Sequence, residues 1–393
     1  MDVAYTRACG IDVHQKSVSV SLLIGDFDTN RPKRTNRKYD TTTNSLKELA
    51  CWLDDNDVQV ATMESTSQYW RRVWQILSRY SHVNVKLVNP QKIKRMPGRK
   101  TDKKDAEWLV DLTRVGMIEP SYIPELSTIE LRESTRLRKN LIQQLTVIKN
   151  EIYNILQRSN IKLTSYLSDI FGVTGMKLMN LLLNGEAINV DTITPLMHGR
   201  MKATAEEIVE ALNGRLSKND RYLIDIQLNL YDALVRSISE IEAHIQEQTN
   251  SFEELRIRLM AIPGVSDHTA AIIMAEIGTN VDAFENEQAI AAWAGLCPGS
   301  YESGGKKYSS KTNRGNKYIK AALAQSAMTA RLSRESDLAN FYYRLAGRIG
   351  AAKAVVALAH KLLRIIYVMI RDGVEYDECK LKSRPFPLEQ PTF

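Results

Sequence analysis

Two aspartates spaced three residues apart lie inside the most basic passage of the chain. They are Asp102 and Asp105, in the run Lys-Thr-Asp-Lys-Lys-Asp-Ala at 100–106. Residues i and i+3 of a helix project from the same face, so the two carboxylates would present their oxygens together. The same run supplies three cations, Lys100, Lys103 and Lys104. Acids among cations suit a site that holds a divalent metal ion and admits a phosphodiester, although a solvated helix start near the N-terminal dipole is the simpler alternative.

A serine followed by two glycines offers a different chemistry nearer the C-terminus. It is Ser303, in the run Ser-Tyr-Glu-Ser-Gly-Gly-Lys-Lys at 300–307, which we expect to be a flexible loop. Such a loop can approach a phosphate closely, and nearby cations could stabilise an alkoxide and a pentavalent transition state. These cations are Lys306, Lys307, Lys311, Arg314 and Lys317. An ordinary surface loop is the alternative, and Ser300, Ser309 and Ser310 are close enough to be confused with Ser303.

A turn at Ile262-Pro263-Gly264-Val265 has the form of a helix-hairpin-helix. In that motif the backbone N–H groups around Gly264 begin the second helix and can hold a DNA phosphate. A plain turn between two helices is the alternative.

Strands and helices alternate through the N-terminal part, and they must position the acids. Residues 8–24 predict two strands joined by a turn near 14–16, since apolar residues alternate with serines over 18–22. A polar turn over 30–38, a strand near 38–41 and a helix over 44–54 should follow. A strand over 58–64, a helix over 67–78 and a strand over 83–88 complete the order. This order predicts an α/β domain whose later strands run parallel.

The predicted strands give two further acids a meaning. Asp12 stands in an otherwise apolar first strand, where an unpaired carboxylate would be costly to bury, and Glu64 ends the strand over 58–64. If these strands are neighbours, the two acids converge, and the helix with Asp102 and Asp105 can close over them. Four carboxylates would supply the oxygen ligands that Mg²⁺ prefers. Alternatively, Asp12 ends a strand and Glu64 pairs with a lysine.

The middle of the chain carries little chemistry but two long apolar seams. Leucines and isoleucines at 141, 145, 148, 152 and 155 predict a helix from about 128 to 157. A similar seam at 224, 228, 231, 235 and 238 predicts another from about 219 to 252. The two helices could form an antiparallel hairpin, an intermolecular coiled coil or part of a bundle. Residues 160–217 between them are interpreted as an insertion without an assigned function.

Bulk properties set wide limits. The 393 residues suggest two or three domains, and a net charge of +7 makes an anionic partner plausible. Four scattered cysteines argue against a structural zinc site or a disulfide framework. The N-terminal residues lack a signal sequence, and no apolar run is long enough to cross a bilayer, so we expect a soluble cytoplasmic protein without a membrane partner.

The motifs together resemble the IS110 family, the DEDD-type transposases of bacterial insertion sequences that are described as bridge-RNA-guided recombinases. The N-terminal matches are 10–16 (Gly-Ile-Asp-Val-His-Gln-Lys), 63–66, 88–90 and 100–106. The C-terminal matches are the Ala-Gly-Leu-x-Pro run at 294–298, Tyr-Glu-Ser-Gly at 301–304 and Gly-Asn-Lys-Tyr-Ile-Lys at 315–320. One departure is Ser67, where such proteins usually have glycine.

The resemblance implies an RuvC-like (RNase H-like) fold with the tetrad Asp12, Glu64, Asp102 and Asp105 binding Mg²⁺, and Ser303 as the residue that attacks DNA. It also implies donor and target double-stranded DNA, a structured bridge RNA, and a homo-oligomer between dimer and tetramer with a composite site between protomers. We expect a nucleoid-associated bacterial protein.

We divide the chain into an RuvC-like domain at 1–118, a helical coiled-coil region at 119–258 and a C-terminal transposase domain at 259–393. The expected function is a transposase that forms a covalent phosphoserine link to DNA. The alternatives are a Holliday-junction-like endonuclease that needs only the carboxylates, a DNA invertase, and a nucleic-acid-binding protein with a degenerate catalytic domain.

Overall fold

The computed structural model describes residues 3–29, 31–65, 68–90, 93, 105–198, 201–297, 301–303, 306–309, 312–333 and 336–377, with only the backbone described at 301–303 and 306–309. Contacts divide the chain into two compact units, residues 1–123 and 124–393. In the described ranges, no helix is long and apolar enough to cross a membrane.

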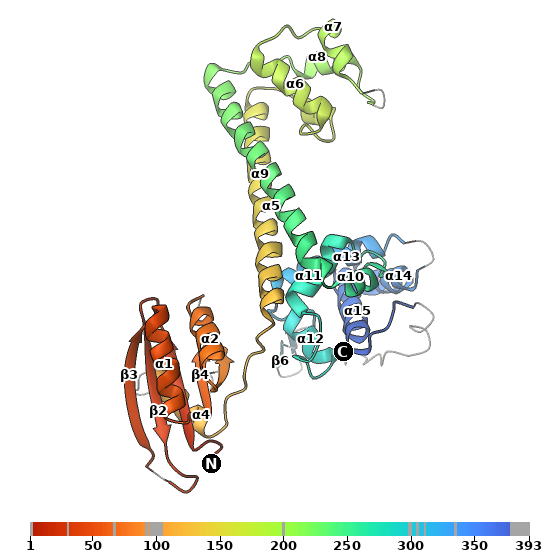
Figure 1. Ribbon diagram of the computed structural model, residues 1–393. Helices are drawn as coiled ribbons and strands as arrows, with labels where there is room; N and C mark the ends of the chain where they lie inside the picture. The colour runs from red at the N-terminus through yellow and green to blue at the C-terminus, as the bar shows by residue number, and fades with distance from the viewer. Residues whose placement is uncertain are drawn as a thin grey trace. The chain divides into compact units, whose positions relative to one another are not determined.

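The first unit is built on a five-stranded mixed sheet (Figure 1). Its strands are β1 (Arg7–Val13), β2 (Ser17–Ile24), β3 (Lys33–Asp40), β4 (Val60–Glu64) and β5 (Asn84–Val88). They lie in the order β3-β2-β1-β4-β5. The first three pair antiparallel, whereas β1, β4 and β5 run parallel. This arrangement confirms the α/β prediction and the parallel direction of the later strands.

The edge strand β3 begins earlier than the sequence predicted. Lys33–Arg37 had been interpreted as part of a polar turn, but these residues pair along β2 from Lys33 opposite Ile24 to Arg37 opposite Val20. The reason is that β3 is an edge strand whose side chains are mostly exposed or half-buried, so it carries no apolar alternation.

Helices cover both faces of the sheet, and the alternation of β1 decides which residues meet them. Cys9, Ile11 and Val13 belong to the core formed with α1 (Thr43–Asp55) and α2 (Tyr69–Tyr80). Ala8 faces the other way and packs with Val110 of α4 (Asp105–Arg114). Since side chains alternate along a strand, Gly10 and Asp12 lie on the α4 face.

The second unit contains an antiparallel pair of 33-residue helices, α5 (Leu126–Arg158) and α9 (Lys218–Asn250). Their direction follows from two ion pairs, because Arg138 contacts Glu242 and Arg158 contacts Asp220 at 2.6 Å. The two predicted helices and the hairpin alternative are confirmed, whereas an intermolecular coiled coil remains a prediction. One seam position was wrong: Val235 is 41% exposed, and the neighbouring Leu234 is the half-buried residue.

A small helical module occupies the far end of this hairpin (Figure 1). It consists of α6 (Val173–Asn184), α7 (Val190–Ile193), α8 (Ala205–Ala211) and the 3-10 turns Leu163–Ser165 and Thr194–Leu196. Its core includes Phe171, whose ring stacks on Tyr231 of α9 with 5.0 Å between centroids.

The other end of the hairpin joins a second, larger core formed by the C-terminal helices. These are α10 (Glu253–Met260), α11 (Asp267–Ile277), α12 (Glu287–Ala294), α13 (Lys317–Ala330), α14 (Asp337–Ile349) and α15 (Ala351–Asp372). Two short antiparallel strands, β6 (Tyr301–Ser303) and β7 (Lys306–Ser309), lie between α12 and α13 in the sequence. The expected flexible loop at Ser303 therefore contains a β-hairpin.

Candidate active site

Asp12 and Glu64 lie at the same end of adjacent strands. Strands β1 and β4 pair in parallel with Ile11 opposite Met63, which places Asp12 and Glu64 one residue further along at the same edge. The pairing meets the condition that the sequence left open, namely that these two strands are neighbours. Neighbouring residues of parallel strands share a face, so both acids stand on the side that α4 covers.

Helix α4 brings a third acid to that end of the sheet. Its last residue, Arg114, accepts a backbone hydrogen bond at 2.8 Å from Ala4, which precedes β1. The carbonyl oxygen of Ala106, at its other end, lies against Gly10 in β1. The helix therefore runs antiparallel to β1, and Asp105, its first residue, lies at the end where Asp12 and Glu64 are found.

A glycine makes this approach possible. A Cβ atom placed on Gly10 would lie 2.2 Å from the Ala106 carbonyl oxygen and 2.6 Å from the Val110 nitrogen. Only a residue without a side chain lets the helix come so close to the strand. The Gly-Ile-Asp run thus contains both a carboxylate and the glycine that seats the helix carrying Asp105.

Two polar links hold the outer side of α4 to the sheet. Arg34 of β3 donates to Asp111 at 2.6 Å, and Asn36 donates to Glu107 at 2.8 Å. Both acids were missed in the sequence, where Arg34 and Asn36 had been read as turn residues. These two hydrogen bonds fix the rotation of α4, the helix that carries Asp105.

The Asp12 carboxylate is 22% exposed and has a local partner. Its Oδ2 lies 3.1 Å from Nε2 of His14, an exposed side chain two residues on. Strand β1 ends at Val13, so His14 is the first residue after it, and its position only two residues from Asp12 was the signal that could have indicated the pair. The histidine can donate to the carboxylate and hold its orientation.

The donors at this site fit a hard divalent ion in kind, because all are carboxylates. Within the described part of the chain, no three His, Cys, Asp or Glu side chains lie close enough together to hold a metal. The fourth predicted acid, Asp102, lies outside the described residues, as do Lys100, Lys103 and Lys104. The tetrad therefore remains a prediction, with three of its members at one end of the sheet.

Ser303 is the last residue of β6 and pairs with Lys306 at the start of β7. Its neighbour Glu302 pairs with Lys307, so the hairpin sets Ser303 and two lysines side by side along the backbone. Lys311 lies outside the described residues, and Arg314 is exposed just before α13. The side chain of Ser303 is not described, and its role as a nucleophile remains a prediction.

The serine segment (residues 293–316), which carries β6 and β7, is closed at its base by contacts between its two ends. The amide of Asn313 donates to the carbonyl of Cys297 at 3.3 Å, and the amide of Asn316 donates to that of Trp293 at 3.0 Å. Gly295 and Gly315 touch backbone to backbone: a Cβ on Gly315 would lie 2.2 Å from the Gly295 nitrogen. Both glycines belong to motifs that the sequence singled out, and the structure gives them this packing role.

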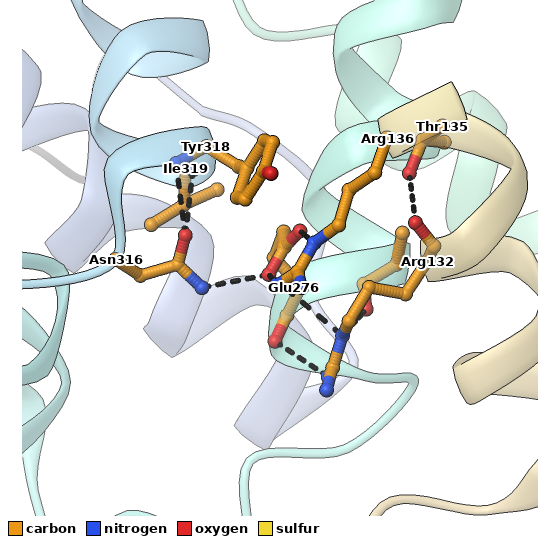
Figure 2. A network of polar contacts seen from close by, with 8 residues as sticks. Arg132, Thr135, Arg136, Glu276, Asn316, Tyr318 and Ile319 are labelled. Carbon is orange, nitrogen blue, oxygen red and sulfur yellow. Dashed lines mark hydrogen bonds and ion pairs between the residues drawn. The ribbon is translucent and has the colours of Figure 1, made fainter. Parts of the chain in front are cut away.

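A buried carboxylate, Glu276 of α11, ties this base to the long hairpin (Figure 2). Its side chain is 1% exposed, and it accepts two hydrogen bonds of 2.8 Å from Arg136 of α5. It also accepts a 2.6 Å bond from the Asn316 side chain. Burial works to lower the pKa of Arg136, but the hydrogen bonds that Arg136 donates to Glu276 and the negative charge of that carboxylate raise it overall. The guanidinium therefore stays charged.

Asn316 links that network to the start of α13. Its side-chain oxygen accepts from the amides of Tyr318 at 2.9 Å and Ile319 at 3.3 Å, as an N-cap does. One side chain therefore caps α13 and bonds Glu276, while its backbone closes the serine segment. Sequence reasoning missed Glu276, although a lone acid in the apolar run of α11 was a visible signal.

The turn at Gly264 also has a packing explanation. Its φ of +85° favours glycine, and a Cβ there would lie 2.4 Å from the carbonyl oxygen of Ser326 in α13. The first turn of α11 is already capped by Ser266 and carries Asp267, which pairs with Arg256. This acid disfavours an anion at that helix start, so phosphate binding by Gly264 remains a prediction that the geometry does not require.

Comparison with known proteins matches the N-terminal and the C-terminal part of the chain to transposases. A DEDD-type transposase model matches residues 9–161, and a model described as "Transposase IS116/IS110/IS902 family" matches residues 257–343. Neither covers 162–256, where the helical module lies.

Individual relatives agree. A "Probable family 20 transposase" of Pseudomonas aeruginosa is 25% identical over 315 residues, covering 78% of this chain and 81% of its own. The "Insertion element IS110 uncharacterized 43.6 kDa protein" of Streptomyces coelicolor is 24% identical, with 72% and 73% covered. The "Transposase for insertion sequence element IS1328" of Yersinia enterocolitica is 29% identical, with 40% and 48% covered.

The matches at both ends of the chain identify a transposase, an enzyme that cleaves and rejoins DNA. More particularly, the two family matches together span more than half of the chain, which belongs to the IS110 family of DEDD-type transposases.

Proposed function

We propose that this transposase is a site-specific recombinase that excises and inserts its own insertion sequence with a carboxylate tetrad and a nucleophilic serine. The observation that carries the proposal is the placement of Asp12, Glu64 and Asp105 at one end of one sheet face. The sheet order β3-β2-β1-β4-β5 supports the RNase H-like fold that such a tetrad needs.

The acids are proposed to hold a divalent ion, with Mg²⁺ the natural choice for an all-oxygen donor set. When bound, such an ion would stabilise negative charge on a DNA phosphodiester. The protein contributes position: the contact at Gly10 seats α4, Arg34 holds its outer face, and His14 orients Asp12.

Ser303 is proposed as the attacking group. Its hydroxyl oxygen would form a bond to phosphorus as the hydroxyl loses its proton, and the bond from phosphorus to a deoxyribose oxygen would break. That oxygen would take up a proton, leaving a phosphoserine link. Attack by the free hydroxyl of another strand would reverse these changes and rejoin the DNA. The cations Lys306, Lys307, Arg314 and Lys317 would offset the charge of the phosphate.

Donor and target DNA, a structured guide RNA, and an oligomer of two to four chains belong to the same proposal, on the strength of the family resemblance. The helix-hairpin-helix role of the Gly264 turn also remains part of it.

Excision of the native element in cells, quantified by PCR across the circle junction, tests the proposal. We expect Asp12→Asn, Asp102→Asn and Ser303→Ala each to lose the junction at unchanged protein level. The matched controls are Asp28→Asn, an exposed acid of the same unit, and Ser309→Ala, the neighbouring serine on β7, which should keep it.

Three outcomes would count against parts of this scheme. A junction that persists in Asp12→Asn would remove the acid site from the reaction. Loss in Ser309→Ala with retention in Ser303→Ala would move the nucleophile to Ser309. Retention in both serine variants with loss in Asp12→Asn would mean that neither serine is the nucleophile, and that the carboxylates act alone or with Ser300 or Ser310.

A further inference from the structure

Three cations converge on one aromatic ring next to the base of the serine segment. The ring is that of Tyr318 in α13, and its centroid lies 4.3 Å from the Arg136 guanidinium, 4.7 Å from the Lys139 ammonium and 5.1 Å from the Lys317 ammonium. Arg136 and Lys139 come from α5, about 180 residues earlier in the sequence. The fold, and not the sequence, creates this cluster.

The positive charge of the cluster is only partly balanced. The single charge of Glu276 is shared by Arg136, which donates two hydrogen bonds to it, and by Arg132, which lies 3.7 Å from it. The Asn316 side-chain amide also donates to this carboxylate. Neither Lys139 nor Lys317 forms an ion pair with any residue that the structure describes. The two ammonium groups lie 4.7 and 5.1 Å from the centre of the same ring, so their charges repel each other, and an anion bound beside them would offset that charge.

The position of the cluster suggests which anion. Tyr318 receives the cap from Asn316, whose backbone closes the segment that carries Ser303. The start of α13, where Lys317 is exposed, adds the positive end of a 14-residue helix dipole, although Asn316 already accepts from two of its amides. Cations interleaved with an aromatic ring are the pattern with which proteins hold a nucleic-acid backbone.

We propose that Lys139, Lys317 and Tyr318 form a binding site for a phosphate group of the DNA backbone. The inference rests on the proposed function, because the strand held there would be the one presented to the serine segment. It adds Lys139 of α5 to the cations that the sequence predicted in the serine run and at the start of α13. Glu276 is the positioning residue of this site, since it fixes Arg136 beneath the ring.

The salt dependence of DNA binding tests the proposal with the full chain. A fluorescein-labelled DNA duplex of random sequence is titrated in EDTA, so that no strand is cleaved, between 50 and 200 mM NaCl. Loss of one phosphate contact lowers the slope of log affinity against log salt by about 0.9, so the advantage of wild type over Lys139→Gln should shrink about 3.5-fold across that range. Lys317→Gln should behave alike, and Lys139→Arg should keep the wild-type slope.

The matched control is Lys149→Gln. Lys149 lies on the same helix, α5, and its ammonium group is 4.8 Å from the ring centroid of Phe171, which belongs to the module at the far end of the hairpin. Both changes remove one charge, so a difference between them reports position and not net charge. Equal slopes for Lys139→Gln and Lys149→Gln would overturn the proposal.

A second arm separates the source of the phosphate. The same titration is made with an RNA duplex, whose phosphates carry the same charge, so a slope difference on both duplexes or on DNA alone supports a site for a DNA phosphate. A difference confined to RNA would overturn the assignment to DNA. Ser303→Ala should bind with the wild-type slope, so failure of the covalent chemistry would be seen in the excision assay without altering this one.

Discussion

Replacing Gly10 by alanine would separate the position of α4 from the chemistry of its acids. The new Cβ would lie 2.2 Å from the Ala106 carbonyl oxygen, whereas ordinary contacts begin at 3.4 Å, so the helix must retreat by about 1.2 Å. The φ of Gly10 is not positive, and the backbone of β1 therefore accepts alanine without strain. The perturbation acts through the displaced helix alone.

The size of the effect follows from what holds α4. Overpacking of this kind costs about 1–3 kcal/mol of unfolding free energy. The helix stays attached through the 2.6 Å bond of Arg34 to Asp111 and the backbone bond from Ala4 to Arg114, so it moves rather than detaches. A displacement of about 1 Å at a reacting centre costs about 100-fold in rate. We therefore expect folded protein with excision reduced about 100-fold.

The assay is digital PCR of the circle junction in cells, with protein level measured beside it and the thermal midpoint measured on purified protein. Gly347→Ala is the control, since a Cβ there meets nothing within 4 Å and α14 should gain slightly in stability. Wild-type excision by Gly10→Ala would contradict this prediction. It would mean that the close contact of α4 with β1 does not set the position of Asp105 for the reaction.

Two further predictions concern the second unit. Glu276→Ala leaves Arg136 and Asn316 without their shared buried acceptor and should lower the unfolding free energy by about 3–5 kcal/mol, measured by urea unfolding. Glu242→Ala, which removes a 47% exposed partner of Arg138, should lower the unfolding free energy by no more than about 1 kcal/mol. Equal losses of unfolding free energy in the two variants would contradict the role of Glu276 as a buried acceptor. Burial and the neighbouring Arg138 lower the pKa of His268 to about 4 from its usual 6.5. The unfolded chain therefore takes up this proton first, and stability should decline as the pH falls from 6.5 to 4, to a smaller extent in His268→Gln; identical pH profiles would rule the histidine out.

The fold of the first unit was largely readable because its core residues follow simple periods. Val18, Val20 and Leu22 alternate along β2, and all three are buried against α1 and α2. The same reasoning failed at β3, whose edge position leaves no apolar face to detect. Convergence of Asp12 and Glu64 could be predicted only conditionally, since the pairing of β1 with β4 depends on contacts some fifty residues apart.

The parts of the site that escaped the sequence depend on distant partners. Glu276 is a single acid among apolar residues, and its donors come from 140 residues before it and 40 after it. Its place in an apolar helix was a visible signal, but nothing local identifies the distant partners of its network. The same holds for the meeting of Lys139 with Tyr318, which no period or spacing encodes. The pairing of His14 with Asp12 could have been predicted, because the two residues are only two positions apart at the end of β1.

The hairpin of α5 and α9 has a consequence for how the length of this chain can vary in evolution. At about 1.5 Å per residue, each 33-residue helix extends roughly 50 Å, and the module beyond it is entered at Arg158 and left at Lys218. Those two ends are held together, since Arg158 bonds Asp220. Material can therefore be added or removed at the tip while the closure of the serine segment, at the opposite end, stays as it is.

Such a change would carry one local cost. The tip residues Ile152, Leu156, Ile224 and Leu228 are covered by the module and would need new apolar neighbours or polar replacements. The tip is thus the point at which variants of this enzyme can differ in length, and a natural position for grafting a foreign domain.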